Sequence, residues 1–329
     1  MNGKLEKTLI ADKKMTNKLK NMPPVLTEFY YDMKNEDKSY TTINNYIDHV
    51  IHFMKFITND RYKRQFYKDV TTTDIKRYMT SIKRKEVNGE IVEVGDEIRA
   101  ARWSSLNAFF TFLRNENYIE ENPVDKTKRP RAKVEHVVTY LDKHEIGGLL
   151  NKIKNEATPM FVNRDLCLIS LGLTTGLRVS AICNINISDI DFNANRIKVI
   201  EKGNKTRYIQ FGESTKELIK SCIKDREKYF AKADTDALFV SRNSNRISTS
   251  MVRILLEKYI DGITTKHITP HKLRASCAVA VYDQTKNILL TKDILGHESV
   301  QTTTRYTRAA EEDKKEAVKF LDEMVQIGQ

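Results

Sequence analysis

The sequence predicts a mostly helical protein with a small antiparallel β-sheet, divided into two domains. Along most of the chain, apolar residues recur at intervals of three and four, the spacing of one helix face. Two short runs rich in β-branched residues flank Gly203-Asn204 and indicate a β-hairpin. A length of 329 residues allows two domains that each bury a core of their own.

The composition favours a polyanionic partner. The formal net charge is +12 at pH 7, and a basic surface attracts a polyanion both directly and by releasing its counterions. A basic protein that is merely soluble is the alternative that composition leaves open. The N-terminus lacks the apolar core of a signal peptide, and no run approaches the roughly 20 apolar residues of a membrane span. We therefore expect a soluble intracellular protein.

The cysteines indicate neither disulfides nor a zinc site. Cys167, Cys183, Cys222 and Cys277 lie far apart, with no C-x-x-C pair and no plausible zinc spacing. We expect reduced thiols that mainly fill space in the core.

The N-terminal third predicts a leader followed by a helical domain. Residues 1–22 are rich in lysine and end before Pro23-Pro24, so we expect a flexible basic leader, with a short docking arm as the alternative. Residues 23–121 form the helical domain. Its first clear helix carries apolar positions from Ile43 to Ile57, and N-cap candidates at 70–74 precede a second.

A third helix is expected from about Glu97 to about Asn115, after a turn between Gly89 and Gly95. Its apolar and aromatic residues have core spacing, so we assign them to packing. The basic residues of this domain are candidates for contacts with nucleic-acid phosphates, and a solvated basic face is the alternative. These candidates are Lys83, Arg84, Lys85, Arg99 and Arg102.

Residues 122–134 predict a basic linker between the two domains. Two prolines, Pro123 and Pro130, disfavour a helix there. We expect the linker to lie along an acidic polymer, and a solvated tether is the alternative. The basic residues that would make this contact are Lys126, Lys128, Arg129, Arg131 and Lys133.

The second domain is expected over residues 135–308. Asp142 is a candidate N-cap for its first helix. A strongly apolar helix then runs from Arg164 and ends at Gly176, which places Arg178 just past the break. A charge at the end of a buried helix must be paired or used, so Arg178 is a candidate functional residue.

The middle of this domain predicts the sheet and its covering helices. Lys202 lies at a strand end beside the Gly203-Asn204 turn, where it reaches outward from the hairpin tip. Helices are expected from about Glu213 to Phe230 and over 249–260. They enclose a short strand at 238–241.

The last sixty residues carry several groups suited to handling a phosphate. Thr269-Pro270 begins a helix that carries His271 and Arg274, and Gly296 ends a second helix just before His297. Tyr306 follows nine positions later. Such breaks let separated side chains converge on one pocket, although each of these residues alone would more often be structural.

In order, Thr175-Gly176-Leu177-Arg178, the hairpin lysine Lys202, His271-x-x-Arg274, Leu295-Gly296-His297 and Tyr306 resemble the signature of the tyrosine recombinases, also called phage integrases. The resemblance covers the second domain. It implies an α+β catalytic domain there, and the preceding region resembles the family's all-helical, SAM-like core-binding domain.

Carried over to these positions, the resemblance implies that Tyr306 attacks a DNA phosphate and becomes linked to its 3′ side. Arg178 and Arg274 would bind the non-bridging oxygens, and Lys202 would protonate the 5′ leaving oxygen. His271 would assist proton transfer and His297 would bind the phosphate. The family needs neither a metal ion nor another cofactor.

The sequence departs from the family pattern at two supporting positions. Ala181 stands where a glutamate is usual, and Ala275 stands where a histidine commonly occurs. We expect the active site to survive with different support around Arg178. Residues 309–329 predict a helix with acidic residues near its start. In the family such a helix often docks on a neighbouring protomer, and packing on its own domain is the alternative.

The resemblance implies a site-specific recombinase that joins strands through a Holliday junction as a homo-tetramer on two DNA sites with inverted-repeat core sequences. A bacterial cytoplasmic, nucleoid-associated enzyme that integrates or excises a mobile element is the expected role, with an accessory directionality factor as a possible partner. Three alternatives remain open. They are a recombinase that resolves chromosome dimers, a type IB topoisomerase and a non-catalytic DNA-binding regulator.

Overall fold

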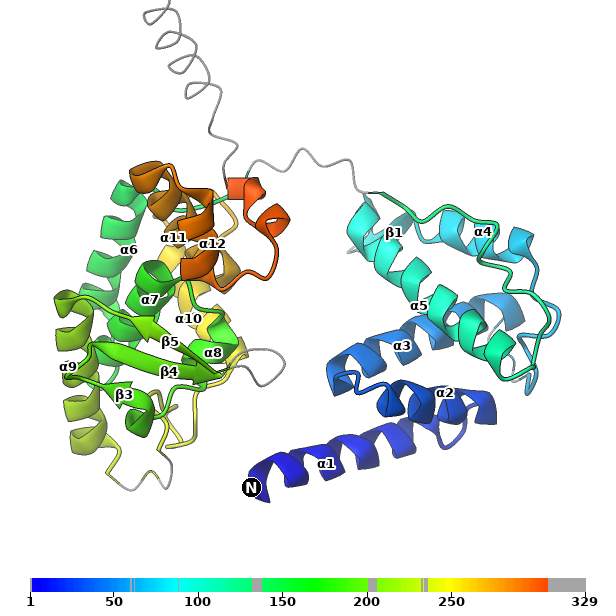
Figure 1. Cartoon of the computed structure of the whole chain (residues 1–329), viewed down its shortest axis with the longest axis horizontal. Coiled ribbons are helices and arrows are strands. Elements are labelled where there is room, and N and C mark those ends of the chain that lie inside the picture. Colours follow the sequence, from blue (N-terminus) through cyan, green and yellow to red (C-terminus); the bar gives the residue numbers. More distant parts are fainter. Residues whose placement is uncertain are drawn as a thin grey trace, which may run out of the picture. The chain divides into compact units, whose positions relative to one another are not determined.

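The computed structural model describes residues 2–306 apart from 60, 62, 88, 132–137, 201–205, 232 and 234–235. The chain divides into two compact units, Met1–Glu135 and His136–Gln329. Figure 1 labels their helices and strands. The predicted helix at 309–329 and the predicted contacts Lys133 and Lys202 lie outside the described residues.

The first unit is a bundle of helices with one β-hairpin. Helix α3 packs against both α2 and α5, and aromatic rings fill the space between them. Phe29 and Phe109 meet edge to face with ring centroids 5.2 Å apart, and both are buried. Its elements are α1 (Asn2–Leu19), α2 (Pro24–Asn35), α3 (Tyr40–Thr58), α4 (Thr72–Ser81), β1 (Arg84–Val87), β2 (Glu90–Glu93) and α5 (Asp96–Asn115).

Local capping signals place the helix starts where the sequence predicts them. The Ser39 hydroxyl accepts a hydrogen bond from the backbone N–H of Thr42, 3.2 Å away, at the start of α3. Thr71 and Asp74 form a reciprocal capping box at the start of α4. Both interactions satisfy N–H groups that a helix N-terminus leaves without intrahelical partners.

The flexible leader predicted for residues 1–22 is wrong. Helix α1 packs on α2, with Met15 and Leu19 buried in the core of the first unit. Asp12 also anchors the helix, because it accepts hydrogen bonds from the Tyr30 hydroxyl and from Lys34, the latter at 2.7 Å. Apolar positions are few among the many lysines of this segment, so the sequence shows no helical apolar pattern that would predict the packing.

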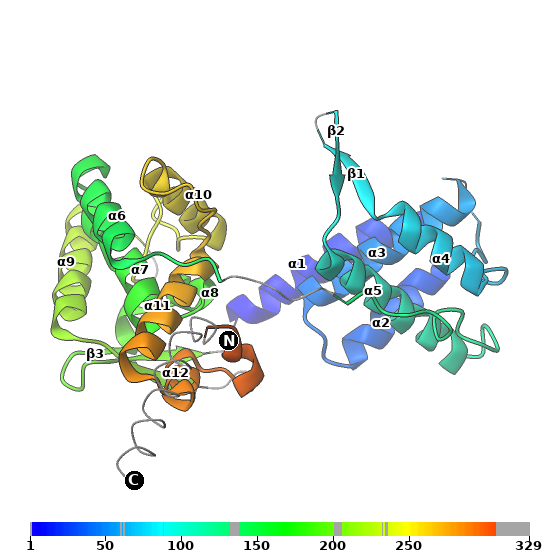
Figure 2. The ribbon, with the colours of Figure 1, turned by 90° about the horizontal axis from the view of Figure 1, so that it is seen from above.

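The β1–β2 hairpin was expected only as a turn. Its antiparallel register pairs Arg84 with Glu93 and Val87 with Glu90, and Gly89 takes a positive φ of 84° between the strands. The ribbon projects from the helices in Figure 2. Because every described residue of both strands is exposed, the hairpin lacks the alternating burial that a sequence pattern would reveal.

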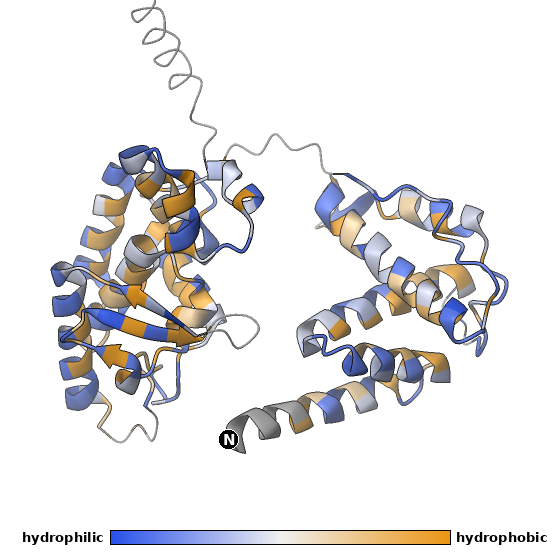
Figure 3. Ribbon diagram, in the orientation of Figure 1, coloured by the Kyte–Doolittle hydropathy of each residue, from blue (hydrophilic) through white to orange (hydrophobic). Residues whose placement is uncertain are grey.

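The second unit surrounds the buried helix α7, which packs against α6, α9 and α11. A three-stranded antiparallel sheet has the order β3-β4-β5, and Figure 3 shows the alternating hydropathy along β4. The helices are α6 (Lys143–Glu156), α7 (Val162–Thr175), α8 (Val179–Cys183), α9 (Glu213–Tyr229), α10 (Thr249–Ile260), α11 (Pro270–Thr285) and α12 (Ile288–Leu295). The strands are β3 (Ile190–Asp191), β4 (Arg196–Ile200) and β5 (Thr206–Gln210), and the 3₁₀ turns are η1 (Ile187–Asp189), η2 (Val300–Thr302) and η3 (Thr304–Tyr306).

The predicted hairpin is confirmed by the pairing of β4 with β5, and the predicted helices from Glu213 and over 249–260 are present. The strand predicted at 238–241 is wrong. Ala237 and Val240 instead form isolated bridges with Asn186 and Arg246. Leu238 and Phe239 between them are fully buried, so core packing explains the β-like composition of this segment.

The predicted packing role of the cysteines is confirmed, because Cys167, Cys183, Cys222 and Cys277 are buried and free. In the part of the chain that the structure describes, no helix is long and apolar enough to cross a membrane.

Glu145 ties the start of the second unit to the segment before α11. It forms a capping box with Asp142, the predicted N-cap, and its carboxylate lies 2.7 Å from the Lys266 ammonium. Burial alone would raise its pKa. Hydrogen bonds from Lys266, Thr264 and the Asp142 backbone N–H outweigh that effect and lower the pKa to about 2.

Replacing Glu145 with Gln should remove a pH-dependent part of the stability. Because the folded pKa lies below the ordinary value of 4.5, the ionised carboxylate stabilises the fold above that value. This stabilisation is lost as the pH falls towards about 2. Thermal unfolding from pH 7 to pH 2 should therefore show wild type and Glu145→Gln converging in acid. The control Glu156→Gln removes a half-exposed carboxylate 3.9 Å from Lys152; an equal pH effect in the control would contradict this assignment.

Candidate active site

The turn between α7 and α8 presents Arg178. Helix α7 ends at Thr175, Gly176 takes the left-handed conformation with φ of 61°, and Arg178 occupies the N-cap position of α8. The Arg178 carbonyl accepts hydrogen bonds from the backbone N–H groups of Ala181 and Ile182 at 2.8 and 3.1 Å. Its backbone is thus fixed, and its side chain is exposed.

Helix α11 brings the second arginine to the same turn. Arg274 is only 1% exposed, and its Nη1 donates a hydrogen bond to the Gly176 carbonyl at 2.6 Å. That carbonyl lies two residues before Arg178, so the contact holds the two predicted arginines near each other. His271, in the first turn of α11, is exposed and lies one helical turn before Arg274.

The chain after α12 brings His297 and Tyr306 together. Gly296 ends α12 in the left-handed conformation, as predicted. His297 Nδ1 lies 2.8 Å from the hydroxyl of the buried Thr303, and the Tyr306 N–H donates to the Thr303 carbonyl at 2.9 Å. The rings of His297 and Tyr306 are nearly parallel, with centroids 6.2 Å apart.

Gly176 is the point where these elements meet. A Cβ at this position would lie 2.6 Å from the Leu295 side chain of α12 and 3.3 Å from the Cys277 sulfur of α11. Leu295 and Tyr306 also share a small apolar cluster with Ala275, Ala278 and Val279 of α11. One close-packed junction therefore positions the segments that carry Arg178, Arg274, His297 and Tyr306.

Sequence reasoning missed two residues of this arrangement. Thr303 links His297 to Tyr306 as described above, and Arg207 of β5 donates to the carbonyls of Asp293 and Ile294 at the end of α12. The sequence shows a second basic residue beside the hairpin, in the Lys-Thr-Arg run at 205–207. Nothing in the sequence indicates that Arg207 would bond to backbone carbonyls of a helix about ninety residues later.

Residues 139–313, more than half of the chain, match the model of the phage integrase family. The chain belongs to this family. Its members, the tyrosine recombinases, cleave and rejoin DNA strands, so the chain is an enzyme of this class.

Curated relatives named tyrosine recombinase XerC match over most of their length. The one from Caldanaerobacter subterraneus subsp. tengcongensis is 31% identical over 317 residues, which cover 90% of this chain and 86% of that protein. The one from Bacillus subtilis is 27% identical over 301 residues, which cover 89% of this chain and 93% of that protein.

Solved structures have the same fold. XerH bound to palindromic difH DNA, in a post-cleavage complex, has a TM-score of 0.68 at 19% identity and covers 88% of this chain and 82% of its own. The Tn1549 transposon integrase with circular-intermediate DNA has a TM-score of 0.64 at 19% identity. The match covers 87% of this chain and 95% of the integrase chain. At these identities the likeness concerns the fold, which agrees with the predicted helical core-binding and α+β catalytic classes.

The two departures from the family pattern lie at buried positions. Ala181 is 8% exposed in the core of the second unit, and Ala275 is 2% exposed beside Tyr306 and Leu295. A glutamate or histidine at these positions would need room and hydrogen-bond partners in the core. In this chain the surrounding apolar side chains occupy that volume.

The predicted DNA-contact residues of the first unit lie in two kinds of environment. Lys83, Arg84 and Lys85 are exposed at the base of the β1–β2 hairpin. Arg99 and Arg102 are half-buried on α5. Arg99 pairs with Asp96 at 2.6 Å, and Arg102 lies 3.4 Å from the Tyr78 hydroxyl.

The predicted linker begins on the surface of the first unit. Asn122 and Val124 are buried, and Trp103 donates a hydrogen bond to the Thr127 hydroxyl at 2.7 Å. Residues 122–127 of the predicted linker therefore pack on the first unit. Lys126 pairs with Glu121 at 2.9 Å, which raises the lysine pKa. The exposed basic residues that follow are Lys128, Arg129 and Arg131.

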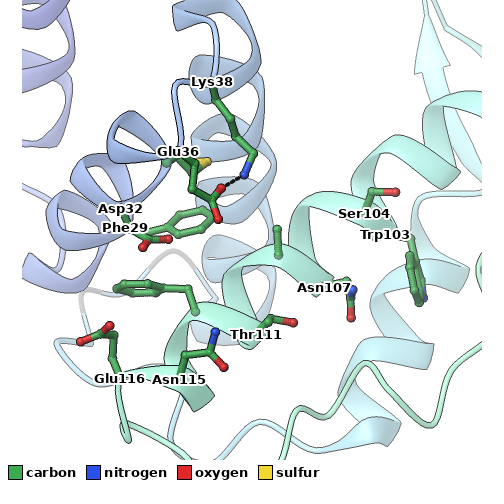
Figure 4. A pocket seen from close by; sticks show the side chains of 13 residues that line it. Phe29, Asp32, Glu36, Lys38, Trp103, Ser104, Asn107, Thr111, Asn115 and Glu116 are labelled. Carbon is green, nitrogen blue, oxygen red and sulfur yellow. Dashed lines mark hydrogen bonds and ion pairs between the residues drawn. The ribbon is translucent and has the colours of Figure 1, made fainter.

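A pocket in the first unit lies between α2 and α5 (Figure 4). Phe29 and Trp103 contribute its apolar walls, and its polar lining includes Asp32, Glu116 and the Glu36–Lys38 ion pair. Three carboxylates are poorly suited to a phosphate. We therefore assign the chemistry to the second unit.

Replacing Gly176 with Ala should destabilise the second unit and slow the reaction. A side chain there meets both the strained φ and the 2.6 Å approach to Leu295, and a left-handed non-glycine residue costs about 1–3 kcal/mol. Thermal unfolding measures the effect. The control Gly147→Ala lies within α6 with nothing within 4 Å of the added Cβ. It should be neutral or stabilising by about 0.5–1 kcal/mol. Equal stability of the two variants would refute the role of Gly176.

Proposed function

We propose that this protein is a site-specific DNA recombinase that cuts and rejoins duplex strands through a 3′-phosphotyrosyl intermediate and a Holliday junction. The observation that supports this most directly is the convergence described above. Arg274 is bonded to the turn that carries Arg178, and the segment that joins His297 to Tyr306 packs against the same helix.

In the proposed reaction the Tyr306 hydroxyl oxygen attacks the scissile phosphorus. A P–O bond to tyrosine forms, the bond to the 5′ oxygen breaks, and the 3′ phosphate stays attached to the enzyme. The tyrosine proton leaves with help from His271, and Lys202 supplies a proton to the departing 5′ oxygen. Attack by a second 5′ hydroxyl reverses these steps, so resealing needs no external energy source.

Arg178 and Arg274 would stabilise the transition state. Attack concentrates negative charge on the non-bridging oxygens, and two planar, permanently charged guanidinium groups can each donate two hydrogen bonds to them. Fixing Arg274 in a buried position avoids the cost of reorganising it during the reaction. His297, held by Thr303, would donate one further hydrogen bond to the phosphate.

The proposed substrate is duplex DNA with inverted-repeat core sites, bound by both units. Structural relatives are described as a dimer on a core site and as a tetramer on a Holliday junction. By analogy we propose a homo-tetramer on two sites, with residues 309–329 docking on a neighbouring protomer and an accessory factor setting the direction. Phosphate contacts from the basic residues would supply affinity without specifying a sequence.

Two biological roles fit the proposed reaction. The fold is shared both with a transposon integrase and with XerH, so at these identities it fits the integration or excision of a mobile element and the resolution of chromosome dimers equally. The curated XerC relatives favour the resolution of chromosome dimers, because they match more closely and nearly end to end. We therefore propose the resolution of chromosome dimers as the first role to test, with the integration or excision of a mobile element as the alternative.

Tyr306→Phe should abolish formation of a covalent protein–DNA complex, because the attacking oxygen is removed. The assay uses duplexes from DNA flanking the gene, nicked beside the cleavage point, in EDTA. Arg178→Gln should slow the reaction by about 10²–10³-fold, as expected for loss of one transition-state donor. Tyr282→Phe, on the same helix as Arg274, is the control and should react normally.

The outcomes separate the alternatives. Tight, specific binding without any covalent complex would favour the non-catalytic regulator. Relaxation of supercoils by wild type, without exchange of strands between sites, would favour the topoisomerase. Exchange between sites that Tyr306→Phe abolishes would support the recombinase.

Removing Lys128, Arg129 and Arg131 together, each as Gln, should weaken binding to all DNA sequences. Each lost phosphate contact should reduce the slope of log affinity against log salt by about one. The matched control replaces Lys220, Lys224 and Lys228 on α9, which are exposed and carry the same total charge. An equal change of slope in both triple variants would show a general charge effect and argue against a linker contact.

A further inference from the structure

Arg207 joins the β-sheet to the end of α12. It lies on β5 opposite Val199 of β4. Its Nη1 donates to the Asp293 carbonyl at 3.0 Å, and its Nη2 donates to the Ile294 carbonyl at 3.2 Å. One planar guanidinium thus holds two successive backbone carbonyls across 86 and 87 positions of sequence.

These carbonyls suit a cation. The last four carbonyls of a helix lack intrahelical partners and form the negative end of its dipole. The Asp293 carbonyl also accepts from the Gly296 N–H at 3.1 Å, so Arg207 and the C-cap glycine share one acceptor. A lysine has no planar fork and could not hold both carbonyls in the same geometry.

The clamped helix end leads directly to the proposed catalytic residues. Immediately after Gly296, the His297 N–H donates to the Lys292 carbonyl at 3.1 Å, and its ring contacts Thr303. Thr303 in turn accepts from the Tyr306 N–H. Hydrogen bonds, together with the short stretches of backbone between them, therefore link β5, through the last turn of α12, to the histidine and the tyrosine.

We infer that Arg207 is a positioning residue that sets the orientation of the His297 imidazole by fixing the last turn of α12. This inference rests on the proposed function, in which His297 binds the phosphate. In this role Arg207 acts through two backbone carbonyls of α12 and not on a reacting atom. Without it, α12 keeps its side-chain packing through Leu295, but the turn that carries His297 loses these two hydrogen bonds to the sheet.

The test compares Arg207→Met with Arg207→Lys. Methionine keeps the aliphatic bulk and removes both donors, whereas lysine keeps the charge and loses the fork. The matched control is Arg196→Met on the neighbouring strand β4, because the Arg196 guanidinium interacts within the sheet with Asp191 and the Tyr208 ring. Thermal unfolding first establishes that each variant folds.

The first readout needs no activity. In the DNA-free protein labelled with ¹⁵N-histidine, imidazole resonances are assigned to His297 with the variant His297→Asn. Arg207→Met should shift these resonances and Arg207→Lys should shift them partly, whereas Arg196→Met should leave them in place. Unchanged His297 resonances in a folded Arg207→Met protein would overturn the inference.

The second readout is the rate of covalent-complex formation on a nicked duplex. Arg207→Met should slow it by up to about 100-fold, the scale of a misplaced reacting group, with the Kd for DNA unchanged. In the double variant Arg207→Met/His297→Asn, the reaction should be no slower than in His297→Asn alone, because both changes remove one function. Multiplicative losses would show that Arg207 acts elsewhere and would contradict the inference.

Failure of the proposed function and failure of the inference about Arg207 give different results. If wild type forms no covalent complex on any DNA tested while Arg207→Met still shifts the His297 resonances, recombination is refuted and the positioning of His297 by Arg207 stands. If wild type reacts and Arg207→Met reacts equally fast, the inference fails and the proposed function is unaffected.

Discussion

The hydrogen bond between the Arg274 guanidinium and the Gly176 carbonyl is the contact on which the second unit depends. A guanidinium that is 1% exposed must be compensated within the protein, and the Gly176 carbonyl, 2.6 Å from Nη1, supplies part of that compensation. The same bond that stabilises the buried charge also joins α11 to the turn that carries Arg178.

The same contact constrains how α7 ends and how α11 and α12 pack beside it. The Gly176 carbonyl can face α11 only if α7 stops there in a left-handed turn. The space beside this turn is filled by Leu295 and Cys277. Leu295 is the last residue of α12, so the position of His297 follows from how this leucine packs. The geometry of the proposed active site is here a consequence of core packing between α7 and the consecutive helices α11 and α12, which lie much later in the chain.

Features with local causes could be predicted from the sequence, and features with distant causes could not. Capping by Asp142 and the helix end at Gly296 depend on neighbours a few positions away, and both are present. The docking of α1 depends on two buried side chains whose partners lie on another helix. Arg207 and Thr303 likewise act on atoms that no periodic pattern indicates. Family likeness predicted which residues react, but the contacts that hold them became visible only in three dimensions.

The burial of all four cysteines has a practical consequence for studying this enzyme. Burial raises the pKa of Cys183 and Cys277 to about 11 and that of Cys167 well above its ordinary value. Almost no thiolate is then present at these three cysteines near neutral pH, and burial keeps reagents from all four sulfur atoms. The native cysteines should therefore not react with thiol-directed labels. A single cysteine introduced on an exposed helix would carry a fluorophore or spin label, so that distances between the units could be followed in solution.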